Sequence, residues 1–140
     1  MKFYEYGKEN DAVILLLPGT CCHWKLNFEE VIPLLALDFH VVCVSYDGFD
    51  ETQDSVFDDM ISQTEKIERY ILENYDGKIK AAYGCSLGGS FVGLLVQRKN
   101  INIEQAILGS SDLDQDEIWK AKLKCKIAIP LLHNRDRKLL

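Results

Sequence analysis

Two short, continuous apolar runs constrain the fold of this chain more than any other feature. Residues 12–18 read Ala-Val-Ile-Leu-Leu-Leu-Pro, and residues 39–46 read Phe-His-Val-Val-Cys-Val-Ser-Tyr. Such runs are typical of strands that are buried on both faces, and these strands belong to parallel sheets covered by helices. Between the two runs lie apolar residues at helical spacing, namely Phe28, Val31, Ile32 and Leu35. This order predicts a strand, helix, strand unit.

Two of the expected helices have recognisable boundaries. Pro33 interrupts the first, so either that helix kinks at Pro33 or Pro33 begins a second short helical turn. Asp54 and Ser55 can cap a later, long helix, which stops at the Asp-Gly pair of residues 76–77. The residues of this long helix that we expect to face inward are Val56, Met60, Ile67 and Ile71.

The remaining segments continue the alternation of strands and helices. We expect strands at residues 79–83, 106–108 and 126–132, and helices after residue 88 and at residues 114–124. Tyr4 and its neighbours are expected to add an antiparallel edge strand. This order predicts the α/β class: a three-layer sandwich with a mostly parallel sheet, in a single domain over residues 1–140.

Charge and hydropathy exclude several classes of function. The chain has 22 acidic and 16 basic residues, a formal net charge of -6, which argues against binding of the nucleic-acid backbone. Its longest aliphatic run, residues 12–17, is far shorter than the roughly 20 apolar residues that cross a bilayer. The first residues lack the apolar segment of a secretory leader. We therefore expect a cytoplasmic protein that binds neither nucleic acid nor membranes.

The cysteines predict neither a disulfide framework nor a metal centre. There are five, with no Cys-x-x-Cys spacing, at Cys21, Cys22, Cys43, Cys85 and Cys125. Cys21, Cys22 and His23 are consecutive, but neighbouring side chains in an extended segment point in opposite directions. A metal site needs three or four converging ligands, so we expect no metal and no other cofactor.

The sequence Gly84-Cys85-Ser86-Leu87-Gly88 carries the strongest functional signal. It stands where a buried strand ends and a helix begins, which is the setting of a nucleophile elbow. A sharp turn brings the neighbouring backbones close together, so the positions two residues either side of Ser86 must be very small. The alternative is that Ser86 is only a helix N-cap. A phosphate-binding loop is disfavoured because both the Lys-Ser/Thr ending and Gly-x-Gly-x-x-Gly are absent.

The chain resembles the α/β-hydrolase family over roughly residues 2–111. The resemblance rests on Leu17-Pro18-Gly19-Thr20, Val31-Ile32-Pro33-Leu34-Leu35, Asp47-Gly48 and Gly84-Cys85-Ser86-Leu87-Gly88-Gly89. It implies that Ser86 is the nucleophile and that the backbone N–H groups of Thr20 and Leu87 form the oxyanion hole. Family members usually have His-Gly where this chain has Pro18-Gly19, a departure that changes the loop but keeps the backbone donor.

The family also implies an acid after a later strand and a histidine near the C-terminus. Asp136 is the match for the acid, and Asp112 is the alternative; a surface aspartate is an equally good interpretation of either. No histidine follows Asp136, so the chain resembles the first two-thirds of a family member. His23 and His133 are interpreted as structural residues, and Cys85 as a small hydrophobic side chain.

These observations support two main functional hypotheses. The first is a serine esterase or thioesterase that acts on small acyl substrates through Ser86. The second is a catalytically inactive, truncated hydrolase-fold module that self-associates as a homodimer, because missing elements would expose a sheet edge and apolar surface. In a third possibility, another chain supplies the missing histidine.

Overall fold

A computed structural model describes residues 1–111 together with Lys120, Leu123 and Lys126. Its elements in chain order are β1 (Lys2–Tyr6), β2 (Val13–Leu17), α1 (Trp24–Phe28), α2 (Ile32–Leu35), β3 (His40–Ser45), α3 (Met60–Tyr75), β4 (Lys78–Cys85), α4 (Leu87–Arg98) and β5 (Asn102–Gly109). The strands form one sheet in the order β1-β3-β2-β4-β5. The two apolar runs become β2 and β3, as the sequence predicts.

The sheet is parallel except at one edge. β3, β2, β4 and β5 pair in parallel, while β1 pairs with β3 in the antiparallel sense, from Lys2 opposite Ser45 to Tyr6 opposite Val41. The antiparallel edge strand expected around Tyr4 is therefore confirmed. β2 lies at the centre of the sheet, and every residue of β2 is buried.

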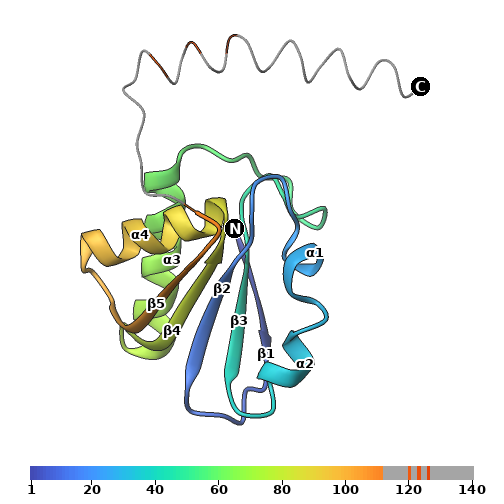
Figure 1. Ribbon diagram of the computed structural model, residues 1–140, viewed down its shortest axis with the longest axis vertical. Helices are drawn as coiled ribbons and strands as arrows, with labels where there is room; N and C mark the ends of the chain where they lie inside the picture. The colour runs from blue at the N-terminus through green and yellow to red at the C-terminus, as the bar shows by residue number, and fades with distance from the viewer. Residues whose placement is uncertain (112–119, 121–122, 124–125, 127–140) are drawn as a thin grey trace.

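Helices cover the sheet on two sides, which confirms the three-layer architecture (Figure 1). Successive side chains of a strand point to opposite faces, so β2 contributes to two cores. Val13, Leu15 and Leu17 of β2 belong to the core under α3 and α4. The intervening Ile14 and Leu16 pack in the smaller core under α1 and α2. The helical residues buried in these cores are Ile67, Ile71, Phe91, Val92 and Leu95 on the first face and Trp24, Phe28 and Ile32 on the second.

The long helix begins later than the sequence predicts. Asp59, not Asp54 or Ser55, is its N-cap, and an Asp59 carboxylate oxygen accepts the backbone N–H of Ser62 at 2.9 Å. Val56 was expected to face inward but is 82% exposed. Residues before Asp59 remain a loop because Phe57 supplies the apolar contact instead, packing against the rings of Tyr46 and Phe91. The predicted stop is correct: Asp76 adopts the left-handed conformation as C-cap.

Pro33 begins a separate short helix, which settles the choice left open by the sequence. It stands in the first turn of α2, where proline lacks no hydrogen bond that the helix needs. The predictions for Asp112, His133 and Asp136 lie outside the described residues, and so do those for the segments 114–124 and 126–132 apart from Lys120, Leu123 and Lys126. Lys120 and Leu123 are helical and exposed, and so is Lys126, where we expected the strand to begin. No helix in the described part of the chain is long and apolar enough to cross a membrane.

Candidate active site

Ser86 occupies a sharp turn between β4 and α4. Its backbone has φ 51° and ψ -114°, a conformation that residues with a side chain adopt rarely. Two hydrogen bonds hold the turn: the N–H of Ser86 donates to the carbonyl of Gly109 at 2.7 Å, and its carbonyl accepts the N–H of Gly89 at 2.9 Å. Ser86 is exposed to solvent. Backbone strain of this kind persists where surrounding structure enforces it, commonly at functional sites.

The glycines around Ser86 allow the backbones to approach closely. A Cβ atom added to Gly84 would lie 2.1 Å from the carbonyl carbon of Gly88. A Cβ atom added to Gly88 would lie 2.0 Å from the carbonyl oxygen of Leu17 in β2. The first turn of α4 therefore packs directly on two strand backbones, as the spacing predicts. Ser86 stands at the N-cap position, but its side chain makes no capping hydrogen bond, so capping does not explain it.

The loop after β2 lies beside Ser86. A Cβ atom added to Gly19 would be 3.6 Å from the Cβ of Ser86. The side-chain oxygen of Asn27 in α1 accepts the N–H of Gly19 at 2.8 Å, and the hydroxyl of Tyr46 donates to the carbonyl of Pro18 at 3.2 Å. These two anchors fix the loop that leads to Thr20, which is exposed. The sequence alone does not predict either hydrogen bond, because Asn27 and Tyr46 lie outside the loop and come from different elements.

The start of α4 supplies backbone donors at the same place. Leu87 is the first residue of α4, and the N–H groups of a first helical turn have no acceptor within the helix. They carry the positive end of the helix dipole, which favours a developing negative charge. The backbone around Thr20 and the N–H of Leu87 are thus both close neighbours of Ser86. This arrangement is suited to stabilising an oxyanion.

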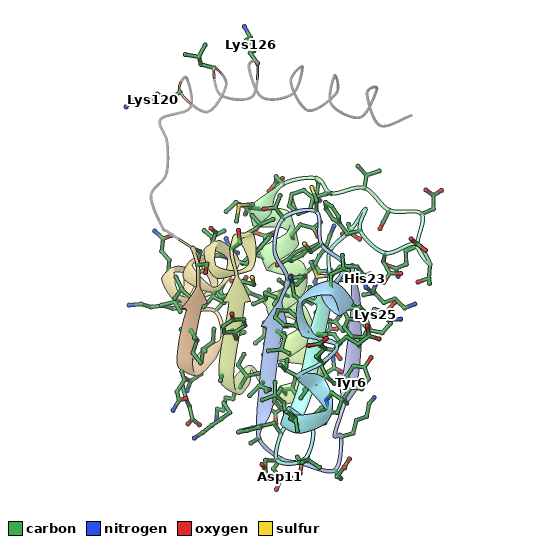
Figure 2. All side chains as sticks on the ribbon, turned by 45° about the vertical axis from the view of Figure 1, so that its right-hand side comes forward. Tyr6, Asp11, His23, Lys25, Lys120 and Lys126 are labelled. Atoms are coloured by element: carbon green, nitrogen blue, oxygen red, sulfur yellow. The ribbon has the colours of Figure 1, made fainter. Side chains whose placement is uncertain are left out.

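No histidine contacts Ser86 within the part of the chain that the structure describes. The Nδ1 atom of His23 accepts the N–H of Lys25 at 3.4 Å, and its ring packs near Trp24, beside α1 (Figure 2). The Nε2 atom of His40, at the opposite end of β3, lies 2.8 Å from a Glu5 carboxylate oxygen. Among the same residues, the Ser86 hydroxyl has no hydrogen-bond partner. Residues 1–111 therefore position Ser86 without a histidine hydrogen-bonded to its hydroxyl.

The described cysteines have free thiols and no shared ligand position. Cys85 is half-buried against the core under α1 and α2, in keeping with its interpretation as a small hydrophobic residue. Cys43 is fully buried in β3, and burial raises the pKa of its thiol to about 12. Cys21 is exposed and Cys22 is partly buried. Among the described residues, no three His, Cys, Asp or Glu side chains are grouped to hold a metal ion.

Two carboxylates after β3, Asp47 and Asp50, are buried, which the sequence did not predict, although Asp47-Gly48 is part of the family resemblance. Asp47 accepts hydrogen bonds from Gln63 at 2.9 Å and from Lys66 at 2.7 Å, and also contacts the N-terminal ammonium group. Asp50 accepts hydrogen bonds from the hydroxyl of Thr52, from the backbone N–H of Thr52 at 3.0 Å and from the hydroxyl of Tyr4 at 2.7 Å. Burial alone would raise the pKa of each carboxyl, but these donors hold both pKa values well below the usual range. Both residues remain ionised near neutral pH and brace the loop between β3 and α3.

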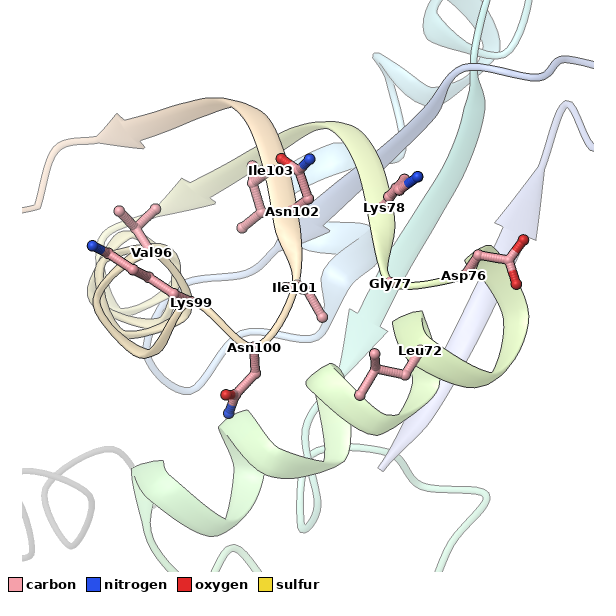
Figure 3. Close-up of a pocket in the computed structure, with 10 residues that line it drawn as sticks. All are labelled: Leu72, Asp76, Gly77, Lys78, Val96, Lys99, Asn100, Ile101, Asn102 and Ile103. Atoms are coloured by element: carbon pink, nitrogen blue, oxygen red, sulfur yellow. The ribbon is translucent and has the colours of Figure 1, made fainter.

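Two hollows on the described part of the surface lie away from Ser86 itself. One, of about 540 Å³, lies at the amino ends of β4 and β5, opposite the end that carries Ser86 (Figure 3). It is lined by Leu72, Asp76, Gly77, Lys78, Val96, Lys99, Asn100, Ile101, Asn102 and Ile103. The other, of about 670 Å³, is an apolar groove on the α1–α2 side of the sheet that ends at Cys85. The first hollow is too far along the strands to belong to the Ser86 site.

The sheet order and the sharp turn at Ser86 between β4 and α4 are the features to compare with known proteins. Residues 12–124 match the family described as alpha/beta hydrolase fold. Because this match covers most of the chain, the chain belongs to that family. The resemblance inferred from the sequence is thereby confirmed.

The individual proteins that this chain is similar to include one named a dioxygenase and one named an alpha/beta hydrolase family protein. The chain is 40% identical over 53 residues to 1H-3-hydroxy-4-oxoquinoline 2,4-dioxygenase of Pseudomonas putida, a match that covers 38% of this chain and 20% of that protein. A putative alpha/beta hydrolase family protein from Desulfitobacterium hafniense superposes with a TM-score of 0.74 at 21% identity, over 79% of this chain and 44% of its own. MenH from S. aureus superposes with a TM-score of 0.73 at 23% identity, over 90% of this chain and 47% of its own. The chain thus spans less than half the length of these proteins.

Proposed function

We propose that the chain carries the nucleophile half of a serine hydrolase site for small acyl substrates. The Ser86 hydroxyl attacks the carbonyl carbon of an ester or thioester, giving an acyl-enzyme and releasing the alcohol or thiol. Water then hydrolyses the acyl-enzyme and regenerates Ser86. The N–H groups of Thr20 and Leu87 stabilise the oxyanion in both steps. The observation that carries the proposal is the strained, exposed Ser86 at the start of α4.

The proposed reaction needs a base that takes the proton from Ser86 and returns it to the leaving group. The acid that orients such a base is assigned to Asp136, with Asp112 as the alternative. The base itself is not among the described residues; the candidates that remain are His133, which the sequence analysis interprets as structural, and a histidine from another chain. His23 is disfavoured because its Nδ1 atom already accepts the N–H of Lys25.

Esters and thioesters suit this site better than amides, because an amine leaving group requires efficient protonation. Membership of the family does not fix the reaction by itself, since one matched relative is named a dioxygenase. A small acyl compound is therefore the proposed substrate class, with no nucleic-acid partner and no membrane partner. The proposed location is the cytoplasm.

The decisive experiment is labelling with a fluorophosphonate probe, read out by intact mass. An activated Ser86 is expected to give one rapid mass increment that is absent from Ser86→Ala. Ser90→Ala, in the same helix, is the matched control and should label normally. A folded protein that does not label would contradict the proposal.

A second candidate function is a non-catalytic module that self-associates. Two observations favour it: the Ser86 hydroxyl has no hydrogen-bond partner among the described residues, and β5 is exposed along most of its length. A strand edge without a neighbour is a template for pairing with another chain. Light scattering over a range of micromolar concentrations tests it, and a monomer throughout would contradict it.

A further inference from the structure

The described part of the chain has five non-glycine residues with a left-handed backbone, and they fall into two groups. Asp76 and Lys99 are the C-caps of α3 and α4, where this conformation is common. The other three follow strands of the parallel sheet: Cys21 comes after β2, Ser86 after β4 and Ser110 after β5. The backbone is therefore strained at the end of β5 as well as at Ser86, and surrounding contacts must hold both places.

The end of β5 is held from two directions. The carbonyl of Gly109 accepts the N–H of Ser86 at 2.7 Å. A Cβ atom added to Gly109 would overlap the hydroxyl of Tyr83 and lie 2.8 Å from the ring carbon that carries it. The Tyr83 side chain thus packs directly on the backbone of Gly109. Ser110 and Ser111 therefore continue from a strand end that has little room to move.

Ser111 packs on the first turn of α4, the helix that lies over β4 and β5 (Figure 1). A Cβ atom added to Gly89 would overlap the hydroxyl oxygen of Ser111 and lie 2.7 Å from its Cβ atom. The Ser111 side chain thus occupies the space that a larger residue in place of Gly89 would need. Gly89 in turn donates its N–H to the carbonyl of Ser86 at 2.9 Å, which closes the turn that contains Leu87.

We propose that Ser111 is a positioning residue for the Ser86 site. Its side chain, seated on Gly89, sets the separation between the end of β5 and the start of α4. Through the Ser86–Gly89 hydrogen bond it aligns the backbone N–H of Leu87. The inference rests on the function proposed above, in which this N–H group stabilises the oxyanion.

The contact between Ser111 and Gly89 is suited to this role because it cannot yield easily. Rotation of the Ser111 hydroxyl would not make room for a methyl group on residue 89, since the Cβ atom of Ser111 would also be too close. Either the start of α4 or the end of β5 would have to shift, and Gly109 holds the end of β5. A shift of α4 moves the Leu87 N–H, and a misplacement of about 1 Å can cost about a hundredfold in rate.

The test moves a small group from one side of this contact to the other, in the complete 140-residue chain. Gly89→Ala adds a methyl group that displaces the start of α4, and Ser111→Gly removes the side chain that supports it. In the double variant the new methyl group fills the vacated space. We expect the rate of fluorophosphonate labelling to fall about thirtyfold in Gly89→Ala and about fivefold in Ser111→Gly, and to recover to within about threefold of the wild type in the double variant.

A second readout follows the Leu87 N–H itself, through its nitrogen–proton NMR cross-peak. We expect this peak to move in each single variant and to return toward its wild-type position in the double variant. A contact that served stability alone would lower the free energy of unfolding without this reversal. Gly93→Ala, at a partly buried glycine further along α4, is the matched control and should change neither readout. Circular dichroism should show that all variants are folded.

The two readouts separate failure of this inference from failure of the proposed function. A wild-type chain that does not label would overturn the function, while the Leu87 peak would still decide whether Ser111 aligns this N–H group. If the wild type labels, an equally fast Gly89→Ala with an unmoved Leu87 peak would overturn the positioning role alone. A double variant that does not recover would overturn it too. Should Gly89→Ala not fold, Ser111→Gly and the double variant decide in the same way.

Discussion

The two faces of the sheet are built from the same strands but are covered very differently. Among the described residues, the core under α3 and α4 contains fourteen buried residues, while the core under α1 and α2 contains seven. Successive strand residues point to opposite faces, yet seven strand residues are buried in the first core and four in the second. The longer helices bury more of the strand surface: α3 and α4 have 16 and 12 residues, whereas α1 and α2 have 5 and 4.

The two faces of the sheet also support different parts of the molecule. The well-covered face supports α4 and therefore holds the turn at Ser86, which must be rigid to keep its strained backbone. The poorly covered face carries the loop anchor Asn27, the exposed apolar residues Leu26 and Leu34, and the apolar groove that ends at Cys85. The comparison predicts that substitutions on the two faces have unequal costs.

The largest effect is expected for Phe91→Ala in α4. Phe91 has no exposed surface and stacks on Tyr46, with ring centroids 4.7 Å apart. Removing a fully enclosed aromatic side chain leaves a cavity, so the free energy of unfolding should fall by about 3–5 kcal/mol. Urea unfolding measures this. Leu72→Ala, on a half-exposed position of α3, is the control and should change little.

A smaller effect is expected for the matching substitution on the other face, Phe28→Ala. Phe28 is 4% exposed, but it borders the groove, where neighbouring side chains and water can move into the space. We expect a loss of about 2–3 kcal/mol in the free energy of unfolding. A loss of unfolding free energy equal to that of Phe91→Ala would show that the two faces are equally well packed, which would contradict the predicted difference between them.

The pH dependence compares two carboxylates that tie the loop after β3 to different elements. Asp47 binds α3 through Lys66, and Asp50 binds β1 through Tyr4. Their pKa values are lowered in the folded state, so the unfolded state takes up protons first as pH falls. The two carboxylates contribute their full stabilisation above the pKa of a carboxyl group in the unfolded chain, which is about 4. This contribution is lost as the pH falls below that value.

Asp50→Asn should therefore cost about 1–2 kcal/mol of unfolding free energy at neutral pH and flatten the loss of stability below about pH 4. Urea midpoints measured from neutral pH downward provide the test. Asp11→Asn is the control, since Asp11 is exposed and has no ion pair among the described residues. An unchanged pH profile for Asp50→Asn would contradict this account.

The smallest effect is expected for the exposed ion pair beside the groove. Lys80 and Glu104 lie 2.6 Å apart, but their side chains are 45% and 58% exposed. Lys80→Ala should lower the free energy of unfolding by about 0.5 kcal/mol or less, and the difference should vanish at about 1 M salt. Arg98→Ala should cost more, because the carboxylate of Glu68 that pairs with Arg98 is buried under α3 and α4.

Much of the fold could be predicted because buried strands leave a strong local signal. The apolar runs of β2 and β3 and the helical spacing between them require no knowledge of distant contacts. The start of α3 could not be predicted in the same way, because Asp54 and Asp59 are equally good caps by residue type. The contact of Phe57 with Tyr46 and Phe91 decides between them, and it exists only in the folded chain.

The candidate site was predictable only in its local part. The spacing of Gly84, Ser86 and Gly88 predicts the close backbone approach that the structure contains. Asn27 gave no signal, and Asp47 was recognised only as part of the Asp47-Gly48 pair, because the roles of both residues depend on partners brought near by the fold. The acid at Asp136 or Asp112 stays a prediction.

The central position of β2 has a consequence for how the chain is made on the ribosome. β2 pairs with β3 on one side, but its other neighbour, β4, emerges only after about 60 further residues. At a synthesis rate of roughly 5–20 residues per second, the edge of β2 that pairs with β4 stays unpaired for several seconds. We therefore expect chaperones that act during translation to bind the first 50 or so residues of the nascent chain, and to leave once β4 has appeared.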